Sequence, residues 1–175
     1  MVNDLTLVKK YLDVQNDRGF LNLNRLVLLG VDTGASLAGY WAMQDWEKGA
    51  SRQTKMLILV SPNTLSVDHD MGKYFEKAGK AFKENVHVLI IVPTLDSTAG
   101  MNATKIKSAL MSEKELANDP PGFASRVPIV RIDTDKSGAE LLSTAELGVC
   151  KTIEDFIADR FEQYKPSDYQ WTRGK

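Results

Sequence analysis

The segment Arg25-Leu-Val-Leu-Leu-Gly30-Val-Asp-Thr-Gly34-Ala35 decides the fold of this chain. Its first half is a nearly continuous apolar run, which is typical of a β-strand covered on both faces, so a strand is predicted over 25–30. A tight turn then leads into a helix over 34–47 that begins with small residues. The pattern Gly-x-Asp-x-Gly therefore places Asp32 at the carboxyl end of a strand and above the amino terminus of a helix, where amide groups stabilise negative charge.

The rest of the chain alternates amphipathic helices with short apolar strands. Further strands are predicted over 55–60, 86–92 and 127–132, and further helices over 4–18, 71–83, 102–117 and 152–164. Strands separated by helices imply parallel pairing through right-handed crossovers. The expected fold class is α/β: a three-layer sandwich with a mainly parallel sheet of about four strands flanked by helices, flavodoxin-like in outline. We expect a single domain over 1–164 and a polar C-terminal tail over 165–175.

Two helix boundaries carry a specific signal. Gly19 follows the first predicted helix, where a glycine commonly caps the carboxyl end. Thr152 and Asp155 have the spacing of a capping box, which predicts the start of the last helix.

The composition is that of a soluble globular protein. The 175 residues carry a formal net charge of −1, with 43% hydrophobic and 26% charged residues. Lys and Arg are spread along the chain, which argues against a nucleic-acid or membrane partner. Cys150 is the one cysteine, so no internal disulfide forms. The chain shows no signal peptide and no apolar stretch of the ~20 residues that cross a bilayer, so a cytoplasmic location is the default expectation, with an exported parent open if the chain is a fragment.

Several segments resemble the α/β-hydrolase superfamily, in particular the carboxyl-terminal half of its fold. The turn around Asp32 stands where these enzymes carry Gly-x-Ser-x-Gly, the nucleophile elbow. Val60-Ser-Pro62 resembles the end of the strand after the elbow helix, and Val92-Pro-Thr-Leu-Asp96-Ser97 resembles the loop that carries the catalytic acid. More narrowly, the chain is similar to bacterial hydrolase-like proteins of the planctomycete type that have an acidic residue at the elbow. Leu23-Asn-Arg-Leu26 and Tyr169-Gln-Trp-Thr-Arg173 also fit that group.

This resemblance spans roughly residues 4–164 and implies a role for each site residue. Asp32 would be the nucleophile, Asp96 the acid, and the amide of Thr33 a hydrogen-bond donor to the oxyanion. The histidine of the family would follow the fourth strand, near residues 135–142.

The catalytic histidine is missing, because the sequence has none between Asp135 and Leu142. The two histidines of the chain are His69, in a loop on the same side of the sheet as Asp32, and His87, at the opposite end of the third strand. An ester formed on Asp32 needs a base that activates water, so turnover without a base stalls after one cycle. About 24 residues, predicted as one helix, precede the elbow strand, so the oxyanion hole keeps one amide at most. Losing one such donor costs ~3 kcal/mol of transition-state stabilisation.

Each candidate residue also has a structural interpretation. Asp32 can cap the helix that follows it, and Asp96 can form a turn. Three adjacent side chains diverge, so Asp68-His69-Asp70 indicates a solvated loop and not a metal site. Cys150 precedes a helix but has no histidine nearby in the sequence, which favours a structural thiol. We therefore expect no metal and no cofactor.

Three functions are compatible with these features. The leading hypothesis is a non-catalytic α/β-hydrolase-like domain with a degenerate active site that serves binding or assembly. The second is a hydrolase of the ester, epoxide or haloalkane type, in which Asp32 is the nucleophile and His69 or a partner supplies the base. The third is a flavodoxin-like module for a small ligand at the turn over 30–35. Against this third function, Asp32 would repel a phosphate, and no Gly-x-Gly-x-x-Gly pattern is present.

The strand over 25–30 is expected at one edge of the sheet, because only a helix is predicted before it. An apolar exposed edge invites pairing with another chain. We therefore expect either a homodimer through this strand or its docking to a separate amino-terminal half.

Overall fold

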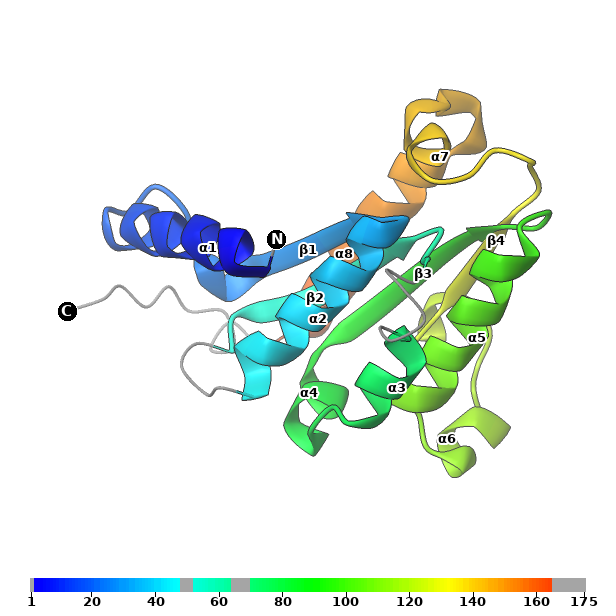
Figure 1. The fold of residues 1–175 in the computed structure, drawn as a ribbon, viewed down its shortest axis with the longest axis horizontal. Helices are drawn as coiled ribbons and strands as arrows, with labels where there is room; N and C mark the ends of the chain where they lie inside the picture. Colours follow the sequence, from blue (N-terminus) through cyan, green and yellow to red (C-terminus); the bar gives the residue numbers. More distant parts are fainter. Residues whose placement is uncertain (1, 48–51, 64–69, 165–175) are drawn as a thin grey trace.

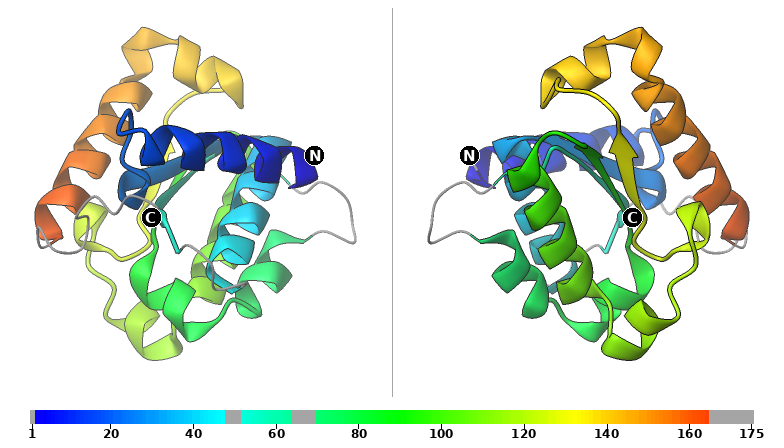
Figure 2. Two further views of the ribbon diagram at one scale, coloured as in Figure 1. Left: turned by 90° about the vertical axis from the view of Figure 1, so that its left-hand side faces the viewer. Right: turned by 90° about the vertical axis from the view of Figure 1, so that its right-hand side faces the viewer.

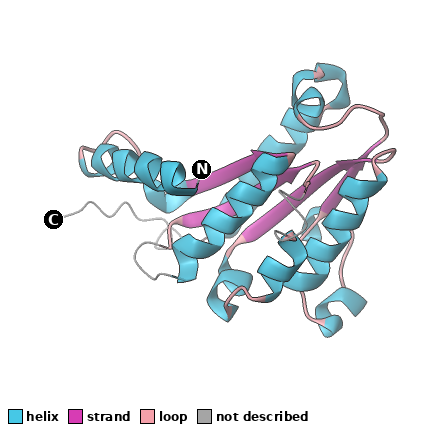
Figure 3. Cartoon of the chain, in the orientation of Figure 1, coloured by secondary structure: helices cyan, strands magenta, loops and turns pink. Residues whose placement is uncertain are grey.

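The computed structural model describes residues 2–47, 52–63 and 70–164, which form a three-layer α/β sandwich (Figure 1). Its central layer is a four-stranded sheet in which all strands are parallel and the order is β1-β2-β3-β4. The strands are β1 (Leu26–Val31), β2 (Thr54–Val60), β3 (His87–Pro93) and β4 (Ile129–Ile132). Figure 3 shows them enclosed between helices. The predicted three-layer α/β sandwich with a parallel sheet of about four strands is confirmed, and each strand begins and ends within two residues of its predicted bounds.

The helices are distributed unequally over the two faces of the sheet (Figure 2). One face is covered by α2 (Thr33–Glu47), α3 (Met71–Glu76), α4 (Lys80–Asn85) and α5 (Ser97–Leu110), and the other by α8 (Val149–Gln163). The strand order explains this distribution. Each of the three crossovers moves one strand in the same direction, and right-handed crossovers in one direction place their helices on one face.

Alternate residues of the two central strands feed separate cores on the two faces. Leu57 and Ile90 pack with α2, α3 and α5, whereas Ile58 and Leu89 pack against α8 around Phe156. These strands are buried on both sides, which is why their sequences are continuous apolar runs.

The first helix, α1 (Val2–Asp17), lies beside β1 at the edge of the sheet (Figure 1). Gly19 follows the carboxyl end of this helix and has a φ of 84°. The amide of Gly19 donates to the carbonyl of Asn16, and the amide of Phe20 donates to the carbonyl of Gln15, both at 3.0 Å. This pair of hydrogen bonds is the Schellman motif, so the predicted cap at Gly19 is confirmed.

Two predicted helices are each broken into two. The helix predicted over 71–83 ends at Glu76, and α4 begins after Gly79, which has extended dihedral angles. The helix predicted over 102–117 ends at Leu110, because Met111 is extended with φ −114° and ψ 143°. A new helix, α6 (Glu113–Ala117), then begins at a capping box between Ser112 and Glu115.

The start of the last helix differs from its prediction. Helix α8 begins three residues earlier than predicted, after Gly148, which has the left-handed φ of 63°. The hydroxyl of Thr152 donates to the carbonyl of Gly148, so Thr152 lies inside the helix and the predicted capping box is wrong. A short helix, α7 (Ala139–Ser143), and the 3-10 turns η1 (Leu23–Arg25), η2 (Gly122–Ala124) and η3 (Ala145–Leu147) complete the described chain.

The predicted tail over 165–175 lies outside the described residues. Within the described ranges, no helix combines the length and the apolar character that a membrane span requires.

Candidate functional site

Asp32 forms the turn between β1 and α2, at the carboxyl end of the sheet. Its φ is 51°, a left-handed value that is uncommon for a residue with a side chain. Main-chain hydrogen bonds hold this conformation: the amide of Asp32 donates to Val60 at 3.0 Å, and its carbonyl accepts from Ala35 and Asn63 at 3.1 and 3.2 Å. Strain of this kind persists only where the surroundings over-determine the backbone, and it is found at functional turns such as the nucleophile elbow.

The two glycines of the turn are not equivalent. A Cβ on Gly30 would lie 2.6 Å from Cα of Ala35 and 2.7 Å from the carbonyl carbon of Gly34, so strand and helix backbones meet here in direct contact. A Cβ on Gly34 would have no atom within 4 Å. A side chain would therefore collide with backbone at Gly30 but not at Gly34.

The segment expected to carry a histidine instead places Gly138 against the carboxylate of Asp32. Gly138 is buried and has a φ of +57°. A Cβ on it would lie 2.8 Å from Cγ and 3.1 Å from Oδ1 of Asp32, and closer still to Oδ2. The backbone before α7 thus occupies the space directly beside the carboxylate.

Ser61 fixes Gly138 in this place. It is buried at the end of β2 and also has a left-handed φ, of 45°. The amide of Gly138 donates to Oγ of Ser61 at 3.0 Å, and the amide of Ser61 donates to the carbonyl of Ile91 at 2.8 Å. Three residues with left-handed backbone, Asp32, Ser61 and Gly138, therefore meet at the carboxyl ends of β1 and β2.

Asp96 lies at the amino end of α5 and has the hydrogen bonds of a helix cap. Its Oδ1 accepts from the amide of Ala99 at 2.9 Å. It lines a cavity of about 460 Å³ together with Thr94, Lys105 and Arg131, and Asp32 is not among the residues that line that cavity. The structure thus places Asp96 at the same end of the sheet as Asp32, but Asp32 does not line the cavity beside Asp96.

Thr33 is the first residue of α2 and is exposed. An amide in the first turn of a helix has no acceptor within the helix, so it remains a donor for a neighbouring anion. The structure therefore places the predicted oxyanion donor immediately after Asp32, at the amino terminus of the helix.

The structure describes one of the two histidines of the chain. His69 lies outside the described residues. His87 begins β3, at the end of the sheet opposite Asp32, as expected from the sequence. Burial, followed by the nearby positive charges of Arg160 and Arg126, lowers the pKa of His87 from 6.5 to about 4. His87 is therefore neutral at pH 7, but it lies too far along the strand to assist Asp32.

No group of three or more His, Cys, Asp or Glu side chains in the described part of the chain is arranged to hold a metal ion. Cys150 is exposed, and its Sγ lies 3.4 Å from the carbonyl oxygen of Leu142.

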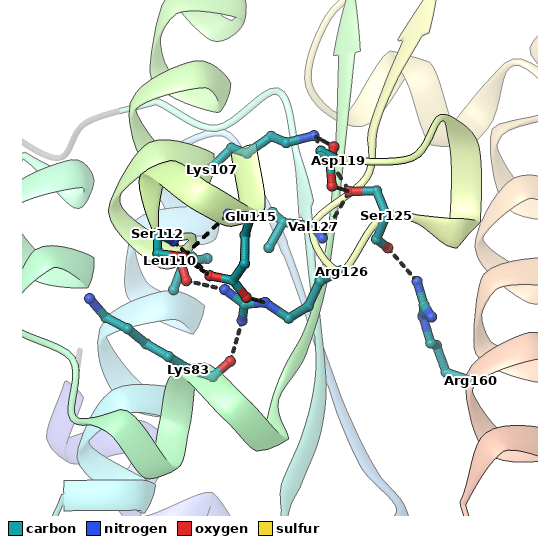
Figure 4. Close-up of polar contacts among 10 residues, drawn as sticks. All are labelled: Lys83, Lys107, Leu110, Ser112, Glu115, Asp119, Ser125, Arg126, Val127 and Arg160. Carbon is teal, nitrogen blue, oxygen red and sulfur yellow. Dashed lines mark hydrogen bonds and ion pairs between the residues drawn. The ribbon is translucent and has the colours of Figure 1, made fainter. Parts of the chain in front are cut away.

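A second concentration of polar side chains lies at the opposite end of the sheet, beside the start of β4 (Figure 4). The guanidinium of Arg126 donates to the main-chain carbonyls of Lys83 and Leu110, and its Nε lies 3.2 Å from Oε1 of Glu115. Hydrogen bonds from the amide and hydroxyl of Ser112 hold the pKa of Glu115 below its ordinary value, so it stays anionic beside Arg126. These contacts fasten α4, α5 and α6 to the beginning of β4.

Arg160 extends this cluster to α8 (Figure 4). It donates to the carbonyl of Ser125 at 2.6 Å and to the carbonyl of Phe123. Oδ1 of Asp119 accepts from the hydroxyl of Ser125 at 2.7 Å, and Lys107 forms an ion pair with Asp119 at 2.5 Å. Burial raises the pKa of Asp119, but the hydrogen bonds from Lys107 and Ser125 outweigh that effect and lower it. The partners belong to the chain itself, so we interpret the cluster as structural.

Comparisons with protein-family models, with curated proteins and with solved structures gave no match for this chain.

Proposed function

We propose that the protein is a non-catalytic α/β-hydrolase-like domain with a degenerate active site, and that it serves binding or assembly. The observation that carries this proposal is the contact between Gly138 and the carboxylate of Asp32. A nucleophilic carboxylate needs open space for the carbon that it attacks and for a base that later activates water. Here the buried Gly138 lies beside the carboxylate.

The position of the histidines supports the same proposal. His87 lies at the far end of β3, and the segment after β4 offers Gly138 where the related enzymes would offer an imidazole. General-base catalysis requires the base within hydrogen-bond reach of the water, either directly or through one further water. His69 is thus the one histidine that could serve a hydrolase built on Asp32, which is the second candidate function.

The strand order counts against the flavodoxin-like alternative. Flavodoxin-like sheets have the order 2-1-3-4-5 and bind their ligand where the order reverses. The sheet in the described residues runs β1-β2-β3-β4 without a reversal, so it lacks that crevice. An unreversed order is compatible with the half of a hydrolase fold that begins at its elbow strand.

Turnover assays on three substrate classes test the proposal: a p-nitrophenyl ester, an aryl epoxide and a haloalkane. We expect the wild-type protein to match Asp32→Asn and buffer alone with each substrate, because no base completes the cycle. Steady-state turnover by the wild type that Asp32→Asn abolishes would refute the proposal. A loss of the same turnover in His69→Ala, relative to the wild type, would establish the hydrolase.

Mass spectrometry on the haloalkane reaction adds a readout that is independent of turnover. If the carboxylate is still accessible, an oxygen of Asp32 bonds to carbon, halide leaves, and an alkyl ester accumulates to one equivalent without being hydrolysed. If Gly138 blocks the carboxylate, no ester forms. Both results agree with a non-catalytic domain, whereas an ester that forms and then decays with release of alcohol contradicts it.

A further inference from the structure

A cavity of about 370 Å³ lies between α1, β1 and α2, at the β1 edge of the sheet. We call it the α1–α2 cavity. Its walls include Leu5 and Leu12 from α1, Leu28 from β1, and Leu37 and Trp41 from α2. Ligand-binding cavities have volumes of roughly 300–1,000 Å³ and mainly apolar walls, whereas packed interiors contain few voids larger than a water molecule. The size and lining of the α1–α2 cavity are therefore those of a site for a small molecule.

The space inside this cavity is evident at Gly34, which is one of the residues that line it. A Cβ added to Gly34 would meet no atom within 4 Å, although this glycine lies in the first turn of α2. Gly34 also belongs to the turn that carries Asp32. The α1–α2 cavity therefore reaches from that turn to α1.

The depth of the lining residues favours a small molecule over a protein partner. Ala38 is 9% exposed and Trp41 is 7% exposed. A protein surface cannot rest on side chains that are buried to this degree, whereas a small molecule can enter between α1 and α2. Val8 also lines the cavity and is 54% exposed, so the cavity opens to solvent on the α1 side.

The charged side chains of the cavity already have partners. Among the described residues, Asp4 and Lys9 are the charged groups that line it. Lys9 forms an ion pair with Asp13 one turn away, and Asp4 has an interaction of its own. A charged ligand would therefore lose its hydration in apolar surroundings without gaining a free counter-charge, which is costly. The lining thus favours an uncharged ligand.

Trp41 supplies one polar group to these walls. Its indole N–H has no acceptor among the described residues, whereas the indole N–H of Trp46, further along α2, donates to the carbonyl of Thr54 at 2.9 Å. A buried Trp N–H usually has a hydrogen-bond partner. The N–H of Trp41 is therefore available to an acceptor on the ligand.

We propose that the α1–α2 cavity binds a small, uncharged and mainly apolar molecule that carries one hydrogen-bond acceptor. An apolar cavity of about 150 Å³ holds benzene, so about 370 Å³ has room for a molecule of two fused rings. This inference rests on the binding role proposed above and names the class of the ligand. Its failure is distinguishable from failure of the proposed function, because its test measures binding at Trp41 and the other measures turnover at Asp32.

Titration of the full chain with β-naphthol, an uncharged alcohol of two fused rings, tests the site. Heteronuclear NMR of the indole N–H groups follows the titration, and Trp41→Phe and Trp46→Phe assign the two resonances. We expect the Trp41 resonance to shift and to saturate with a dissociation constant on the order of 100 µM. Trp46 is the internal control, because its N–H is bonded to Thr54 and it does not line the cavity.

The anionic analogue β-naphthoate tests the preference for an uncharged ligand. It has the same rings but carries a carboxylate, so we expect it to bind at least tenfold more weakly than β-naphthol. Equal or tighter binding of β-naphthoate would overturn the proposed ligand class.

Filling the cavity tests its location. Gly34→Leu and Leu5→Trp add apolar atoms from opposite walls, so each should weaken binding of β-naphthol at least tenfold without lowering the temperature of thermal unfolding. Gly79→Leu is the matched control for Gly34→Leu. A Cβ on Gly79 would also meet no atom within 4 Å, but Gly79 does not line the cavity, so binding should be unchanged.

Three further outcomes overturn the proposal. The first is a Trp41 resonance that does not shift, or does not saturate, at millimolar β-naphthol. The second is wild-type affinity in both cavity-filling variants, which would place the probe elsewhere. The third is a lower unfolding temperature in both variants, which would show that other parts of the chain already fill the cavity.

Discussion

Gly30 and Gly34 stand on either side of Asp32, yet the structure gives a steric reason for glycine at one of them. At Gly30 the backbones of β1 and α2 touch, so any Cβ would meet main-chain atoms that cannot rotate away. At Gly34 the space beyond the hydrogen is open, and its backbone is not left-handed. The Gly-x-Asp-x-Gly pattern is thus one steric requirement followed by one permissive position.

Alanine at each position should separate the two glycines. Gly30→Ala forces strand and helix apart, and overpacking of this kind costs about 1–3 kcal/mol in the free energy of unfolding. Gly34→Ala lies in a helix, where alanine is favoured over glycine by about 0.5–1 kcal/mol, so it should be neutral or slightly stabilising. Urea denaturation of both variants checks this, and equal destabilisation would contradict the proposed geometry of the turn.

At the scale of the element, strands were more predictable from the sequence than helices. A strand buried on both faces has to be apolar along its whole length, so its sequence marks its own limits. The breaks at Gly79 and at Met111 leave no comparable mark, because the apolar periodicity continues through them and the chain turns to keep α4 and α6 in contact with the domain. The predicted start of α8 at Thr152 is wrong, because the helix begins after Gly148, whose left-handed conformation the capping-box spacing does not indicate.

One buried cation ties α8 to the segment before β4. Arg160 is 4% exposed, stacks over the ring of Phe156 and donates to the carbonyls of Phe123 and Ser125. Arg160→Met keeps the apolar stem of the side chain but leaves the carbonyls of Phe123 and Ser125 without this donor, which should cost about 2–4 kcal/mol in the free energy of unfolding.

A matched control for this variant is available in the same helix. Lys151 is exposed and pairs with Asp155 one turn away, so Lys151→Met should leave the midpoint of urea denaturation unchanged. The structural role of Arg160 would be disproved if both variants unfolded at the same urea concentration as the wild type.

At the scale of the whole molecule, the candidate site combines a predictable residue with an unpredictable neighbour. The turn around Asp32 is local, so its glycines and the flanking strand and helix indicate it directly. Gly138 reaches Asp32 only after the chain has crossed the sheet from β1 to β4, and nothing in a Ser-Gly pair within a polar segment signals that contact. The sequence shows that the segment 135–142 has no histidine, whereas the structure shows that Gly138 of this segment lies beside Asp32.

The pH dependence of stability is a property of the whole molecule that His87 should dominate between pH 4 and 6.5. Burial, followed by the charges of Arg160 and Arg126, lowers the pKa of His87 to about 4, while Asp159 opposes this shift. The unfolded chain therefore binds a proton in this window that the folded chain does not, so stability is complete above pH 6.5 and falls as the pH drops towards 4. A shift from 6.5 to about 4 corresponds to a loss of up to about 3 kcal/mol in the free energy of unfolding.

Replacing His87 by Phe keeps a ring against Tyr164 and removes the titration. The difference in unfolding free energy between the wild type and His87→Phe should therefore shift by that amount between pH 7 and pH 4. Carboxylates and His69 titrate in both proteins and cancel in the difference, and a difference that does not change with pH would show that His87 is not protonated selectively on unfolding.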